Sequence, residues 1–284
     1  MVQVGPHGAF SVNSMGLDRA PFPLSFSVHE AMGCGIVYAA AAQAAELADV
    51  LMSTANGTFI VVGLETNSFL DDEYLPWRPS RIAAEQGVDC EVHSLDVLTS
   101  GVIGLSEEAL VIRRDDLPRF LAGWSPYELT LIDVPGTPTA ERVDEIVLAL
   151  GTALHGEPVL PALAGSRLWF SGHDDCYVAV ESTDPVMPAA VLSRLLALLA
   201  GSALFDASAV DVTDPDVETM ESLIEESPHW IGVLGTRSDG SIAVDLSATS
   251  EPWRLGQSAP EQVDRTAIYD IAYGAWRLTG PLHR

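Results

Sequence analysis

Residues 230–246 read WIGVLGTRSDGSIAVDL, and this stretch decides the fold class. Its two apolar runs, 230–234 and 242–246, flank Ser238-Asp239-Gly240, and an Asp-Gly pair between such runs is a strong signal for a β-hairpin. A second pair of runs, 167–170 and 177–180, predicts another hairpin. Hairpins join antiparallel strands, so we expect an α+β order in the C-terminal half of the chain.

Apolar spacing around the two hairpins predicts further helices and strands. Residues 110–124 fit a strand, a helix or both, because Pro118 interrupts the apolar pattern. The first half alternates between the two kinds of element, so a parallel βαβ order also fits there. We expect strands at 58–62, 88–92, 129–134 and 210–212, and helices at 29–53, 81–86, 137–150, 188–199, 214–226 and 258–275.

Residues 151–165 contain three glycines and two prolines without a regular charge pattern, which is typical of a linker. We therefore predict two lobes of mixed sheets covered by helices. The N-terminal lobe, 1–156, is expected to be α/β and the C-terminal lobe, 157–284, α+β. A single domain is the alternative.

The chain is strongly acidic, because 40 aspartates and glutamates stand against 14 basic residues, for a formal charge of −26 at pH 7. This charge is spread evenly over both halves. An acidic surface repels phosphate backbones, so we expect no nucleic-acid partner. It attracts a basic protein, although the same charge also serves solubility alone.

All the basic residues are arginine, and the absence of lysine excludes Schiff-base enzymes, lysine-tethered pyridoxal enzymes and P-loop phosphate binders. The cysteines, Cys34, Cys90 and Cys176, form no Cys-x-x-Cys pair, and we interpret them as small buried residues in a reducing compartment. No apolar run reaches the roughly 18 residues of a membrane helix, and the N-terminus does not resemble a signal peptide. We expect a cytoplasmic protein that does not bind membranes.

The sequence lacks a complete dinucleotide-binding loop and the nucleophile motif of many hydrolases. Gly33-Cys34-Gly35 resembles the start of a dinucleotide-binding loop, but Tyr38 stands where the third glycine belongs, and residues 28–32 do not resemble a strand. The sequence contains no Gly-x-Ser-x-Gly motif. We therefore expect no cofactor, and enzymatic activity stays an open question.

His173, Asp174 and Asp175 form the most chemically suggestive cluster, because an imidazole beside carboxylates can bind a metal or transfer protons. They lie in a predicted turn, where Asp is favoured for backbone reasons alone. No second motif such as His-x-x-His supplies further ligands, so we predict no metal site.

A second set of candidates comes from the repeated tripeptide Pro-Trp-Arg. An arginine next to an indole can clamp a carboxylate or phosphate and stack a flat ligand. The alternative is that each tripeptide is a loop held by a buried tryptophan, with its arginine paired to one of the many acids. The candidate ligand-binding residues are Trp77, Arg78, Arg81, Trp253 and Arg254.

Two functions follow from these observations. The first is a non-catalytic acidic protein of the cytoplasm, such as an immunity, adaptor or chaperone-like factor, that binds a basic partner protein. The second is an enzyme or ligand-binding protein with a small-molecule pocket between the lobes, built from arginine, histidine and aspartate side chains.

Overall fold

A computed structural model of the chain describes fifteen stretches of the sequence, and all structural statements below concern these residues. They are 2–3, 9–10, 24–31, 33–40, 57–63, 78–94, 108–123, 129–152, 168–172, 177–200, 216–234, 242–251, 261–270, 273 and 275–280.

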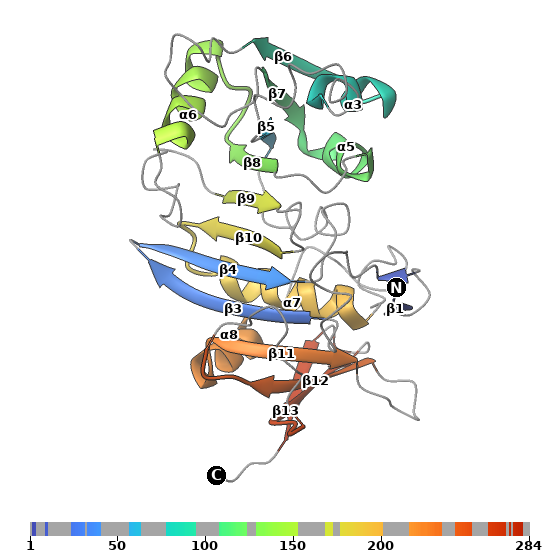
Figure 1. Cartoon of the computed structure of the whole chain (residues 1–284). Helices are drawn as coiled ribbons and strands as arrows, with labels where there is room; N and C mark the ends of the chain where they lie inside the picture. The colour runs from blue at the N-terminus through green and yellow to red at the C-terminus, as the bar shows by residue number, and fades with distance from the viewer. Residues whose placement is uncertain are drawn as a thin grey trace.

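A twelve-stranded sheet runs through the whole molecule, in the order β14-β13-β12-β11-β3-β4-β10-β9-β8-β5-β7-β6 (Figure 1). A separate two-stranded sheet pairs β1 (Val2–Gln3) with β2 (Ala9–Phe10). The strands of the large sheet are β3 (Leu24–Ala31), β4 (Cys34–Ala40), β5 (Thr58–Gly63), β6 (Cys90–Ser94), β7 (Glu108–Arg113), β8 (Leu129–Val134), β9 (Leu168–Gly172), β10 (Tyr177–Ser182), β11 (His229–Leu234), β12 (Ile242–Ala248), β13 (Arg265–Asp270) and β14 (Ala275–Thr279).

Every neighbouring pair of described strands in the large sheet is antiparallel. With its helices, the molecule is therefore an α+β protein, as predicted. The parallel order that also fitted the first half is not found among the described strands. The sheets are antiparallel rather than mixed.

The hairpin of β3 and β4 comes early in the chain but lies among strands of its C-terminal half. β3 pairs with β11, and β4 pairs with β10. Between the halves, β8 pairs with β9. The division into 1–156 and 157–284 stays a prediction.

The central residues of β5 are all apolar because the strand has an apolar cluster on each face of the sheet. Phe59 and Val61 face the larger apolar cluster, whereas Ile60 and Val62 face the smaller one. All four are fully buried because helices cover both faces of the sheet at this point. The larger cluster packs beneath α3 (Pro79–Glu85), α5 (Leu117–Gly123), α7 (Met187–Ala200) and α8 (Val217–Glu226), and the smaller beneath α6 (Ala140–Thr152).

Most predicted elements are confirmed. Residues 110–124 contain both kinds of element, since β7 leads through a short 3-10 helix, η3 (Arg114–Asp116), into α5. The helix expected from residue 137 begins at Ala140, where the Thr139 hydroxyl accepts a hydrogen bond from the Arg142 amide at 3.3 Å. The strands at 58–62, 88–92 and 129–134, the helices at 81–86, 188–199 and 214–226, and both hairpins are present.

The helix predicted at 29–53 is wrong over its first part, because residues 24–31 and 34–40 form β3 and β4. Alanine favours helices, but each of these strands hydrogen-bonds to a neighbour on both sides, and this pairing overrides the local preference. The assignment of residues 28–32 as non-strand is wrong for its described part, 28–31, for the same reason. Gly33, with φ +79°, makes the turn into β4, so the glycines here close a hairpin.

The final helix predicted at 258–275 is also wrong, because β13 and β14 occupy its described part. Residues 266–269 of β13 are all buried, so the strand shows no alternation that would distinguish it from a helix. The predicted linker beyond residue 152 and the predicted strand at 210–212 lie outside the described residues.

Candidate binding groove

The sequence-predicted site residues are only partly described. His173, Asp174, Asp175, Trp77, Trp253 and Arg254 lie outside the described residues. Arg78 and Arg81 are described and lie at the start of α3, where the Arg78 carbonyl accepts hydrogen bonds from the amides of Arg81 and Ile82. The two arginines are thus one turn apart, and their role in ligand binding stays a prediction.

Arg81 already has a carboxylate partner. Its Nε lies 3.0 Å from Glu85 Oε1, one helical turn further along, and both side chains are exposed. The start of α3 is fixed to the sheet, since the Ser80 amide donates to Glu108 Oε1 at 2.7 Å. A ligand at Arg81 would therefore compete with an existing ion pair.

A groove lies between the β3–β4 hairpin and the helices α7 and α8, with a volume of about 520 Å³. Its apolar lining includes Val28, Ala189 and Ile224. Val28 and Ala189 belong to the main apolar cluster and Ile224 packs against it, so the groove opens onto the core. In Figure 1, α7 runs behind β3 and β4, and α8 lies beside it.

The hairpin closely approaches α7 because Gly35 has no side chain. A Cβ atom at Gly35 would lie 2.6 Å from Pro188 Cγ, which is too close for any contact without movement. The start of α7 is held by Asp184, whose Oδ1 accepts from the Val186 amide at 3.0 Å. Two local features therefore set one wall of the groove, a glycine on the hairpin and a capped helix start.

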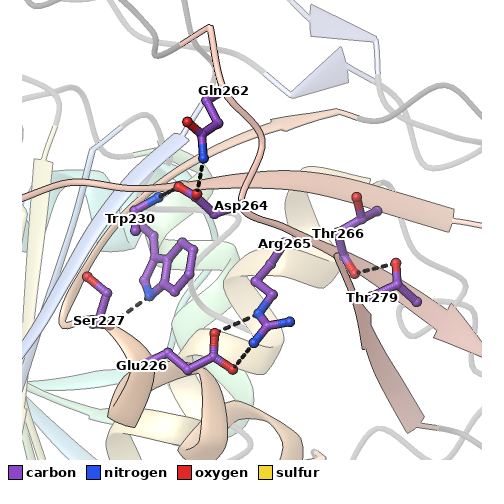
Figure 2. Close-up of polar contacts among 9 residues, drawn as sticks. Glu226, Ser227, Trp230, Gln262, Asp264, Arg265, Thr266 and Thr279 are labelled. Carbon is purple, nitrogen blue, oxygen red and sulfur yellow. Dashed lines mark hydrogen bonds and ion pairs between the residues drawn. The ribbon is translucent and has the colours of Figure 1, made fainter. Parts of the chain in front are cut away.

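Both ends of α8 are anchored to the sheet. At its start, Asp216 accepts from the Thr219 amide at 3.1 Å and from the Trp276 amide of β14 at 2.6 Å. At its end, Arg265 of β13 donates to Glu226 through Nε at 2.6 Å and Nη2 at 2.7 Å (Figure 2). This bidentate pair raises the pKa of Arg265, mainly through the hydrogen bond to Glu226.

The chain leaving α8 is held as well, because Trp230 Nε1 donates to the Ser227 carbonyl at 2.7 Å (Figure 2). Next to it, the Val28 amide of β3 donates to the Pro228 carbonyl at 2.7 Å. These two bonds tie the end of the helix to the strand on the other side of the groove.

Three glutamates give the groove its charge. Glu30 comes from β3, and Glu221 and Glu225 come from α8; all three are exposed. The described lining residues include no arginine or histidine, and none of the three glutamates forms an ion pair with a described residue. With three glutamates and no described basic residue in its lining, the groove is acidic.

The position of Glu221 and Glu225 along α8 makes this charge unfavourable for the helix itself. They are four residues apart and so repel each other across one turn. Glu225 also lies in the last turn, where the helix dipole is negative and where α8 has no basic residue. Glu226 is neutralised by Arg265, but the two groove glutamates have no such described partner.

A second, shallower pocket of about 400 Å³ lies near β6 and is lined by Cys90 and Arg113. Arg113 Nη2 is paired with Asp116 Oδ2 at 2.9 Å. The pKa of the Cys90 thiol is raised by burial and by the neighbouring Asp89 and Glu108. A thiol with a raised pKa is a poor nucleophile, so this pocket does not favour covalent chemistry.

Cys34 is similarly unreactive, because burial and the charge of Glu181 raise its pKa. Its position in the smaller apolar cluster confirms the interpretation of a buried apolar residue. Among the described residues, no group of three or more His, Cys, Asp or Glu side chains is arranged to hold a metal ion.

Comparison with known proteins gives no relative. No protein-family model, no curated protein and no solved structure matches this chain. Within the described part of the chain, no helix has the length and apolar character needed to cross a membrane.

The groove was not found from the sequence. The sequence places Glu221 and Glu225 in the helix predicted at 214–226 and Glu30 in the helix predicted at 29–53, so nothing predicts that they lie together. One signal was present: α8 ends in two glutamates with no basic residue in its last turn, against the usual preference of helix ends. The contribution of Glu30 depends on strand pairing, which has no local signal.

Proposed function

We propose that the protein is a non-catalytic acidic protein of the cytoplasm that binds a basic partner protein, as an immunity, adaptor or chaperone-like factor does. The groove between the β3–β4 hairpin, α7 and α8 is the proposed contact surface. The observation that carries this proposal is its lining, which combines three glutamates with an apolar floor and no described basic residue.

Charge at two scales supports this function. The formal charge of −26 steers a basic protein toward the molecule from a distance. At close range, Glu30, Glu221 and Glu225 provide carboxylates from two separate elements, so a partner can be oriented as well as attracted. Apolar floor residues supply the contact area that charge alone lacks.

The proposal is tested by capturing partners from lysate on the immobilised protein over a series of salt concentrations. Basic proteins should be retained at low salt and released as salt rises, because screening shortens the reach of charges from about 10 Å at 0.1 M to about 3 Å at 1 M. Retention of no basic protein at low salt, or retention that is indifferent to salt, would refute the proposed function.

The charge-reduced variant Glu221→Gln/Glu225→Gln should retain less of the same partner. The matched control is Glu218→Gln/Glu261→Gln, because it removes the same number of charges from two exposed glutamates that do not line the groove. The control variant should retain the partner nearly as well as the parent protein.

A further inference from the structure

We infer that the groove takes an amphipathic basic segment of the partner, with an apolar side chain on the floor and arginine or lysine side chains against the glutamates. This inference rests on the proposed function and specifies which part of the partner is bound and where. It is argued from the floor, the charges and the size of the groove.

The floor favours an apolar side chain. Val28 and Ala189 are already covered, at 5% and 2% exposed, so the apolar surface that still faces water comes from three other lining residues. These are Ile224 and Pro188, which are half-buried, and Pro185, which is exposed. A side chain placed here removes apolar surface from water on both molecules and extends the existing core outward. A metal ion or a small polyamine could not use this surface.

The glutamates favour a cation beside that apolar side chain. Glu221 and Glu225 repel each other across one turn, and Glu225 also opposes the dipole at the end of α8. A guanidinium or ammonium group between them relieves both effects at once. Glu30 lies on β3, so a second basic residue of the same segment has a carboxylate from another element.

The size of the groove favours a segment over a single ion. A volume of about 520 Å³ is within the range of roughly 300–1,000 Å³ typical of ligand sites, and it is larger than one side chain requires. No described trio of ligand side chains is arranged for a metal. A short stretch of chain with apolar and basic residues on one face matches the shape, the floor and the charge together.

The test uses a fluorescently labelled synthetic peptide of interspersed leucine and arginine, titrated with the full-length protein by fluorescence anisotropy. Binding to E221Q/E225Q should be about tenfold weaker, since two exposed ion pairs are lost, and binding to the control E218Q/E261Q should change by less than about twofold. The peptide with citrulline in place of arginine, and the peptide with serine in place of leucine, should each bind several-fold more weakly than the parent peptide.

Equal losses in E221Q/E225Q and E218Q/E261Q would overturn the inference, because they would show a general effect of charge. Equal binding of the citrulline or serine peptide, or no binding of the parent peptide, would overturn it as well. The outcome is separable from that of the proposed function. If the captured partner binds E221Q/E225Q as well as the parent protein and is still released by salt, the proposed function stands and the groove assignment fails.

Discussion

Tyr269 of β13 is a buried tyrosine whose hydroxyl has no hydrogen-bond partner among the described residues. Its ring meets Trp276 edge-on, with centroids 5.2 Å apart. Burial raises the pKa of Tyr269; the charges of Asp216 and Asp270 add to this, and the charge of Arg194 opposes it. The ring thus contributes packing, while the hydroxyl carries an uncompensated desolvation cost.

A raised pKa in the folded state has a defined effect on stability at high pH. Tyr269 binds its proton more tightly when folded than when unfolded, where the ordinary value is 10.0. The corresponding contribution to the free energy of unfolding is fully present below about pH 10 and is lost as pH rises through the folded pKa.

Tyr269→Phe should therefore be as stable as the parent protein at neutral pH, or more stable by up to about 1 kcal/mol, because it removes a buried hydroxyl and keeps the ring. Its loss of stability between about pH 9 and pH 11 should also be smaller. Urea unfolding across this range measures both effects. Tyr273→Phe is the control, since Tyr273 is 84% exposed, and an equal alkaline loss in both variants would contradict the assignment.

At the scale of elements, α8 contains glutamates in two opposite electrostatic settings. Glu218 lies in the first turn, where a negative charge is favoured by the helix dipole. Glu225 lies in the last turn and four residues after Glu221, where a negative charge is disfavoured. The same substitution at these two positions removes one charge from the molecule but changes the interaction with the helix dipole with opposite sign.

Glu225→Gln should raise the free energy of unfolding by about 0.3–1 kcal/mol. Glu218→Gln should change it by less, because the favourable dipole interaction that is lost at Glu218 is offset by relief of its repulsion from Glu221, three residues further on. Urea unfolding at low ionic strength measures the difference. Because both variants lose one charge from the molecule, its overall self-repulsion cancels in the comparison. Changes of the same sign and size would show that α8 does not experience the expected local field.

The elements that the sequence predicts correctly are those whose signal lies within one short segment of the chain. The strand at β5 could be predicted because a run of β-branched and aromatic residues between two glycines is typical of a buried strand. The turn residues between 234 and 242 similarly predicted the hairpin of β11 and β12. Helices α7 and α8 could be predicted because the helical spacing of their apolar residues is visible within a single segment of the sequence.

The wrong predictions involve residues whose partners are distant in sequence. Ala39 and Ala40 of β4 pair with Val178 and Tyr177 of β10, and their helix preference is weaker than this pairing. In β13, Ala267 pairs with Leu278 and Val244 on its two sides. No pattern within 258–275 reveals those neighbours, so the spacing of Val263 and Ala267 was misinterpreted as helical.

At the scale of the whole molecule, the acidic composition predicts a negative surface but not the place where the negative charge meets an apolar floor. The groove brings together residues 28–35, 183–189 and 221–225. This arrangement depends on the pairing of β3 with β4 and on α7 packing next to α8. No pattern within any one of these segments therefore predicts it.

The net charge of −26 predicts that salt acts on stability and on binding with opposite signs. Added sodium chloride screens the repulsion among surface carboxylates, so the free protein should unfold at a higher temperature. The same screening weakens attraction to a basic partner. Thermal unfolding from about 10 mM to about 500 mM salt tests the first effect, and a falling Tm would contradict it.

The place of the β3–β4 hairpin in the sheet has a consequence for the chain as it is made. Both strands leave the ribosome early, but their outer neighbours, β10 and β11, are translated only after most of the chain. At about 5–20 residues per second, the hairpin waits many seconds with both edges open. Open edges pair readily with other chains, so the nascent protein is most prone to aggregate in this interval. We therefore expect protection of that hairpin during translation to raise the yield of folded protein.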